Sequence, residues 1–150
     1  MLVLLVEDNP AEARLTQEAL RETGFVHELH IVSDGEKATQ FLHRQNGFAN
    51  AATPGIVLLD LNLPRKSGRE VLREMKSDPS LCSIPVIVIS NSISPDDVND
   101  VYRLNGNCYL VKPQDLDSMF EMVRTMVDFW FRKAQLPEKT GENFQPLHDL

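Results

Sequence analysis

The chain has 150 residues, of which 42% are hydrophobic and 25% are charged, so it can bury one substantial core like an ordinary globular domain. Its formal net charge of −7 at pH 7 argues against binding of nucleic acid, and it has no apolar run long enough to cross a membrane. Its two cysteines, Cys82 and Cys108, are expected to be free thiols in a reducing cytoplasm.

Five short apolar runs, rich in branched side chains, are expected to form β-strands. The run that starts at residue 56 is apolar until it ends at Asp60, which is typical of a central strand buried on both faces. The run at 27–32 is more polar and is expected nearer an edge of the sheet. In chain order, the expected strands cover residues 2–6, 27–32, 56–60, 86–89 and 108–111.

Helix signals follow these strands. Asn9 with Pro10, and Ser94 with Pro95, each combine a good N-cap residue with a proline in the first helical turn. Gly24 is expected to end the first helix. The expected helices begin near residues 10, 35, 68, 95 and 115, and the last of them runs to about residue 134.

The regular alternation of strands and helices predicts an α/β fold with a parallel sheet and helices on both faces. Right-handed crossovers leave few possible topologies. A flavodoxin-like, doubly wound sheet of five strands in the order 2-1-3-4-5 fits, and the first and third strands then flank the switch point where ligands bind.

Polar residues stand at or just after the carboxyl ends of four of these strands. Because the strands are parallel, these residues should meet at one edge of the sheet. Taken singly, each could be a helix cap or a solvated surface charge, but together they indicate a site. In chain order they are Glu7 and Asp8, Asp60 and Asn62, Ser90, and Lys112.

This set of side chains suits phosphoryl chemistry. Three carboxylates so close together would repel one another, so we expect a bound cation, and an oxygen-only ligand set favours Mg²⁺ or a similar hard ion such as Mn²⁺. Asp60 is the natural nucleophile for a phosphoryl group. Lys112 could hold a phosphate oxygen, and the hydroxyl of Ser90 could turn to bind a newly arrived oxygen.

Four motifs together resemble the receiver domain of two-component response regulators. They are LVEDNP at 5–10, LLDLNLP at 58–64, SNS at 90–92 and KP at 112–113. The resemblance covers about residues 1–134, so we expect a receiver domain over 1–136 followed by a polar tail, 137–150, with no output domain. The output would then be a protein contact or a phosphorelay.

The resemblance implies that a sensor histidine kinase phosphorylates Asp60. It also implies that Asp8, Asp60 and the backbone carbonyl of Asn62 hold Mg²⁺, and that Glu7 acts on the metal through water. Such a protein is a phosphoacceptor that assists its own phosphorylation and dephosphorylation, rather than a classical enzyme.

The same resemblance implies a conformational switch. Ser90 would be the switch hydroxyl, Tyr109 the aromatic residue that changes rotamer with it, and Lys112 the partner of the phosphoryl group. The Lys112–Pro113 peptide bond would be cis, an isomer that proline tolerates.

Further segments are similar to the small regulators that partner phytochrome-type photoreceptor kinases. These segments are NGFAN at 46–50, GREVL at 68–72, NCY at 107–109 and FWF at 129–131. They suggest a phytochrome-type kinase as the partner.

The expected last helix carries a second apolar stripe beside its core-facing one, formed by Met122, Met126 and Phe129. Methionine and aromatic residues are enriched at interfaces, so we expect a homodimer through the fourth helix, the fifth strand and the fifth helix. The alternative is that the chain's own tail covers this stripe through Phe144 or Leu147.

Two other classes remain open from the residues alone. A phosphohydrolase of the haloacid dehalogenase type also orders an aspartate, a serine and a lysine, as in Asp60, Ser90 and Lys112. That class needs a second acid where this chain has Asn62, and it places its metal-binding acids after the lysine. A flavin-binding module would need a phosphate-binding loop after the first strand, where this chain instead has two acids.

Overall fold

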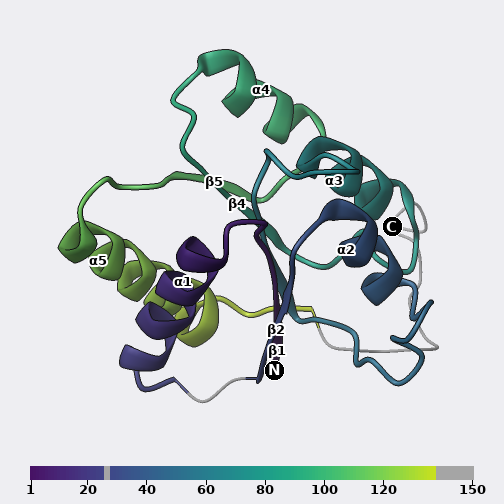
Figure 1. Cartoon of the computed structure of the whole chain (residues 1–150), viewed down its shortest axis with the longest axis horizontal. Coiled ribbons are helices and arrows are strands. Elements are labelled where there is room, and N and C mark those ends of the chain that lie inside the picture. The colour runs from purple at the N-terminus through teal and green to yellow at the C-terminus, as the bar shows by residue number, and fades with distance from the viewer. Residues whose placement is uncertain (26–27, 138–150) are drawn as a thin grey trace.

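The computed structural model describes residues 1–25 and 28–137, and its centre is a parallel sheet flanked by helices (Figure 1). The strand order β2-β1-β3-β4-β5 is the predicted one. All four strand pairs are parallel. The predicted second strand included His27, which lies outside the described residues. The strands are β1 Leu2–Val6, β2 Glu28–Val32, β3 Ile56–Leu59, β4 Val86–Ser90 and β5 Cys108–Val111.

In the part of the chain that the structure describes, five α-helices connect and follow the strands, and they cover both faces of the sheet. Helices α1 and α5 pack on one face, while α2, α3 and α4 pack on the other (Figure 1). Within the described part of the chain, no helix is long and apolar enough to span a membrane. The helices are α1 Pro10–Glu22, α2 Gly35–Leu42, α3 Gly68–Ser77, α4 Pro95–Arg103 and α5 Leu116–Val127.

The last helix differs from the expected single α-helix in its final turns. After α5, the chain widens into a short π-helix, η1, over Asp128–Lys133. The N–H of Ala134 accordingly donates to the carbonyl of Phe129, five residues earlier, at 2.8 Å. The wider turn contains the aromatic triplet at 129–131. These rings are therefore spaced around the helix axis differently from the way they would be in an α-helix.

Of the two expected N-cap residues, Asn9 caps its helix with its side chain and Ser94 does not. The side chain of Asn9 accepts hydrogen bonds from the N–H groups of Ala11 and Glu12, at 2.9 and 3.2 Å, as predicted. Ser94 occupies the N-cap position of α4, but its side chain makes no capping hydrogen bond. Its N–H instead donates to the hydroxyl of Ser92, at 3.2 Å.

The centre of the sheet is fully apolar. Alternate residues of β1 and β3 point to opposite faces, so that Leu58 packs in the core against α1 and α5, and Leu59 packs in the core on the other side. Both side chains are fully buried, and burial of each contributes roughly 1.5–3 kcal/mol of hydrophobic stabilisation. This packing fixes the strand that ends immediately before Asp60.

The start of α3 packs directly against the backbone that follows β3. A Cβ added at Gly68 would lie 2.2 Å from the carbonyl oxygen of Asp60. The N–H of Gly68 donates to the carbonyl of Leu61 at 3.0 Å. Only a residue without a side chain fits here. The start of α3 therefore packs against the backbone of Asp60 and restrains its position.

Candidate functional site

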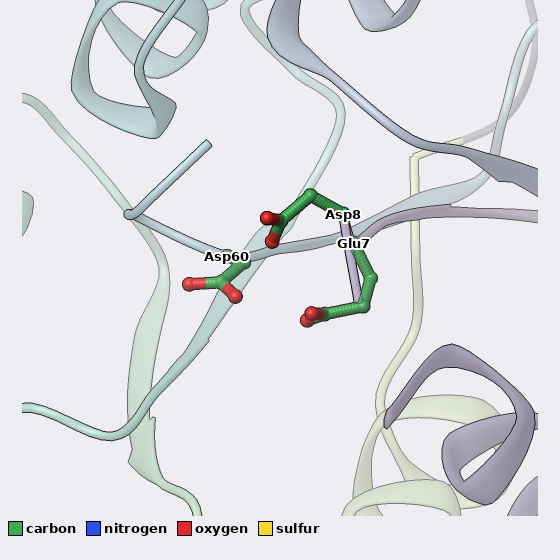
Figure 2. Close-up of side chains that lie close together, drawn as sticks. All are labelled: Glu7, Asp8 and Asp60. Atoms are coloured by element: carbon green, nitrogen blue, oxygen red, sulfur yellow. The ribbon is translucent and has the colours of Figure 1, made fainter. Parts of the chain in front are cut away.

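Three carboxylates gather at the carboxyl edge of the sheet. Glu7 and Asp8 follow β1, and Asp60 follows β3, and Figure 2 shows the three side chains around one shared space. One oxygen from each lies within 4.8 Å of the others. The parallel pairing of β1 with β3 brings them together, since the N–H of Asp60 donates to the carbonyl of Val6 at 3.1 Å.

These carboxylates suit a hard divalent cation. Glu7 and Asp60 are buried, whereas Asp8 is exposed, so an ion held here would keep part of its hydration. An oxygen-only donor set with this much charge favours Mg²⁺ or Mn²⁺ over Zn²⁺. Asn62 lies beside the cluster, and its N–H donates to Oδ1 of Asp60 at 3.1 Å. That bond fixes one oxygen of the Asp60 carboxylate.

Lys112 reaches this cluster from the end of β5. Its Nζ lies 3.2 Å from Oδ2 of Asp60, 3.0 Å from Oε2 of Glu7 and 2.9 Å from Oε2 of Glu12. Its backbone N–H donates to the carbonyl of Ser90 at 2.8 Å, which ties the lysine to the end of β4. The structure thus brings the predicted lysine and the predicted nucleophile into direct contact.

The charges of these groups depend on one another. Burial raises the pKa of Glu7 to about 7, although the nearby ammonium of Lys112 opposes this effect. Burial alone would lower the pKa of Lys112, but hydrogen bonds to Glu12 and Glu7 and the charge of Asp60 raise it above its ordinary value. The hydrogen bond from Lys112 lowers the pKa of Glu12. The lysine therefore stays charged.

Glu12 was missing from the predicted site. It lies in the first turn of α1, three residues after the N-cap Asn9. An acid in the first turn is ordinarily explained by the helix dipole, so nothing in the pattern marks Glu12 as a residue of the site.

Ser90 and Tyr109 both bind the segment that follows β4. Ser90 is fully buried, and its hydroxyl accepts a hydrogen bond from the N–H of Ser92 at 3.2 Å. The hydroxyl of Tyr109 donates to the carbonyl of Ser92 at 2.8 Å. The hydroxyl of Ser92 in turn donates to Asp97 of α4, which also pairs with Arg69 of α3. The two predicted switch residues are thus connected to α4 through Ser92.

One expectation about this edge of the sheet is wrong. The Lys112–Pro113 peptide bond, expected to be cis, is trans, and the described residues contain no cis peptide bond. Proline lowers the energy of the cis isomer without requiring it, so the sequence alone could not decide between the two.

A doubly wound α/β domain with this acidic cluster and a lysine at its switch point matches one family. Residues 3–124 match the response regulator receiver domain, and the chain belongs to that family. The family match favours the receiver resemblance over the phosphohydrolase and flavin-binding alternatives. The amide of Asn62, where the phosphohydrolase class needs an acid, agrees with this result.

Among individual relatives, the chain is similar to response regulator Rcp1 of Synechocystis sp., with 46% identity over 136 residues, covering 91% of this chain and 92% of that protein. A crystal structure of the Mn²⁺-bound form of Rcp1 superposes with a TM-score of 0.87 at 46% identity, covering 91% of this chain and 99% of the other. The structure of the phosphorylated cyanobacterial phytochrome response regulator RcpA gives 0.88 at 47% identity, with 91% and 98% covered.

Proposed function

We propose that the protein is a signalling receiver whose Asp60 accepts a phosphoryl group from a sensor histidine kinase. The observation that carries this proposal is the buried carboxylate of Asp60, which lies 3.2 Å from Nζ of Lys112 at the switch point of the sheet. In the transfer, a carboxylate oxygen of Asp60 attacks phosphorus while the bond from phosphorus to the donor's histidine nitrogen breaks. Lys112 stays protonated and binds a phosphoryl oxygen.

A divalent cation is part of this proposal, with Mg²⁺ or Mn²⁺ held by Asp8, Asp60 and the backbone carbonyl of Asn62, and with Glu7 acting through water. Two observations support it, namely the cluster of carboxylate oxygens and the Mn²⁺-bound form of the similar protein Rcp1. When bound, the ion would neutralise charge on the phosphoryl oxygens. The same groups would assist hydrolysis of the phosphoaspartate.

Intact-mass measurement tests this proposal. After incubation with Mg²⁺ and acetyl phosphate, the protein should gain one phosphoryl group, and the Asp60→Asn variant should gain none. Omission of Mg²⁺ should also prevent the gain. If neither acetyl phosphate nor a histidine kinase produces an adduct, the receiver function is refuted.

The switch would follow from the new charge at Asp60. Phosphorylation replaces the single negative charge of the Asp60 carboxylate with a phosphoryl group that carries roughly −1.5 to −2 charges, and the hydroxyl of Ser90 can turn toward it. Ser90 would then release the N–H of Ser92, the residue that also holds the hydroxyl of Tyr109. The segment before α4 would shift to a second packing.

The proposed kinase partner is of the phytochrome type, acting in the cytoplasm. The support is the similarity to RcpA, which is described as a phytochrome response regulator. We expect an autophosphorylated phytochrome-type kinase to transfer its phosphoryl group to this protein faster than a chemotaxis-type kinase does. Equal rates from the two kinases would contradict this choice of partner.

We further infer that the protein forms a homodimer through α4, β5 and α5. A groove of about 450 Å³ between β5 and the last helix is lined by Leu110, Met122 and Phe129 among others. Val111 and Leu116 are two more exposed apolar side chains of β5 and α5. The predicted second stripe is only partly at this surface, because Met126 is buried in the core while Phe129 is 54% exposed. The alternative cover, Phe144 or Leu147, lies outside the described residues.

Light scattering across a concentration series tests the dimer. Phe129→Ser should shift the wild-type dimer toward monomer, because it removes the largest exposed apolar side chain of the groove. Arg73→Ser is the matched control, since Arg73 is exposed on α3 on the other face of the sheet. A wild-type protein that is monomeric at every concentration, phosphorylated or not, would exclude the dimer.

A further inference from the structure

The ammonium group of Lys112 has no hydrogen-bond donor to spare. A lysine ammonium carries three N–H donors. Its three close acceptors are Oε2 of Glu12 at 2.9 Å, Oε2 of Glu7 at 3.0 Å and Oδ2 of Asp60 at 3.2 Å. If Lys112 is to bind a phosphoryl oxygen, it must give up one of these contacts.

The three acceptors differ in how easily water can replace the lysine. The contact with Asp60 passes to the phosphoryl oxygens once Asp60 carries the group, so the acids that compete for the ammonium are Glu7 and Glu12. The side chain of Glu7 is only 5% exposed, so its carboxylate would lose a charged partner without gaining solvent. The side chain of Glu12 is 39% exposed, so water can solvate its carboxylate once the lysine leaves. Of these two competing contacts, the one between Lys112 and Glu12 is therefore the easier to break as the ammonium moves toward the phosphoryl oxygens.

Glu12 also differs from the other two acids in its relation to the metal cluster. The oxygens that lie within 4.8 Å of one another come from Glu7, Asp8 and Asp60. Glu12 belongs to α1 and contacts the site chiefly through Lys112, while hydrogen bonds with Glu7 and Asn91 also lower the pKa of its carboxyl. Its negative charge competes with a phosphoryl group for the same ammonium.

We propose that Glu12 is a positioning residue, a displaceable counter-ion that holds Lys112 in the unphosphorylated protein and yields it to the arriving phosphoryl group. The exchange breaks one ion pair and forms another, and no covalent bond of Glu12 or Lys112 changes. This inference rests on the proposed function of Asp60 as the phosphoacceptor. It makes Glu12 a determinant of how tightly the site holds a phosphoryl group.

Binding of beryllofluoride in the presence of Mg²⁺ tests the inference, since this anion mimics a phosphoryl group on an aspartate. Equilibrium titration followed by fluorine NMR gives the dissociation constant. Glu12→Gln should bind the anion about two- to fivefold more tightly than wild type, which is the range expected for loss of one partly exposed competing ion pair. Glu18→Gln is the matched control, because it removes the same charge from an exposed position of α1 and should leave the affinity unchanged.

The variant Glu12→Asp separates loss of the contact from loss of the charge. Its carboxylate stays near the site but is one methylene shorter, so it should lose the contact with Lys112 and tighten binding much as Glu12→Gln does. An affinity for Glu12→Asp equal to that of wild type would mean that charge repulsion alone acts, and would overturn the inference.

The remaining outcomes are equally decisive. Unchanged or weaker binding by Glu12→Gln, relative to the Glu18→Gln control, would overturn the role of Glu12 and leave the phosphoacceptor intact. No binding of beryllofluoride by the wild-type protein would overturn the proposed function and this inference together. Circular dichroism spectra matching wild type would show that each variant is folded.

Discussion

Replacement of Glu7 by glutamine should change how the stability of the metal-free protein depends on pH. In the folded protein, burial raises the pKa of Glu7 from 4.5 to about 7, against the opposing effect of Lys112. Between these two pH values, the folded protein therefore binds more protons than the unfolded chain does. The stability that this provides is complete below about pH 4.5 and is lost as the pH rises through about 7.

The size of the effect follows from the same pKa values. The shift from 4.5 to about 7 corresponds to a total of roughly 3 kcal/mol, because one pKa unit is worth about 1.4 kcal/mol. About 2 kcal/mol of this should be lost between about pH 5.5 and pH 8. Glutamine keeps the shape of the side chain but does not titrate, so the Glu7→Gln variant should not show this loss.

Urea unfolding at several pH values, with a chelator present, measures the effect. The free energy of unfolding of wild type, minus that of Glu7→Gln, should fall as the pH rises. Excess Mg²⁺ should reduce the fall, since a nearby cation favours the charged carboxylate. A difference between the two proteins that is the same at every pH would show that Glu7 does not carry the raised pKa.

Two other substitutions probe the backbone and the switch. Gly68→Ala would place a Cβ 2.2 Å from the carbonyl oxygen of Asp60, so the free energy of unfolding should fall by roughly 1–3 kcal/mol. Phosphorylation by acetyl phosphate should also become slower. An unchanged rate of phosphorylation would contradict the close packing. Tyr109→Phe removes the hydrogen bond to the carbonyl of Ser92, so it should cost about 0.5–1.5 kcal/mol in chemical denaturation, and no measurable loss would show that this bond contributes nothing.

The sheet and the acidic cluster could be predicted because they depend on local patterns. Apolar runs such as 56–59 mark buried strands, and parallel strands bring their carboxyl ends to one edge. Once the strand order was inferred, Asp60 had to lie beside Glu7 and Asp8. The register of these two strands follows from the polar residues that end them, since the apolar runs stop at Glu7 and at Asp60.

The features that the sequence did not predict depend on side-chain packing. Whether Glu12 contacts Lys112 depends on how α1 is turned against the sheet, and a first-turn acid is common for other reasons. The π-helix at Asp128–Lys133 has no sequence signal comparable to a cap or a proline. Ser94 is a residue type that commonly caps helices, but in the structure its N–H donates a hydrogen bond to the hydroxyl of Ser92.

If Asp60 is the phosphoacceptor, then it alone among the acids of the cluster should carry the phosphoryl group. The most direct measurement is to phosphorylate the protein with acetyl phosphate and Mg²⁺, reduce the acyl phosphate with borohydride, and locate the modified residue by tandem mass spectrometry of its peptides. We expect modification at Asp60 and at no other acid of the cluster. Modification at Asp8 or Glu7, with Asp60 unchanged, would contradict it.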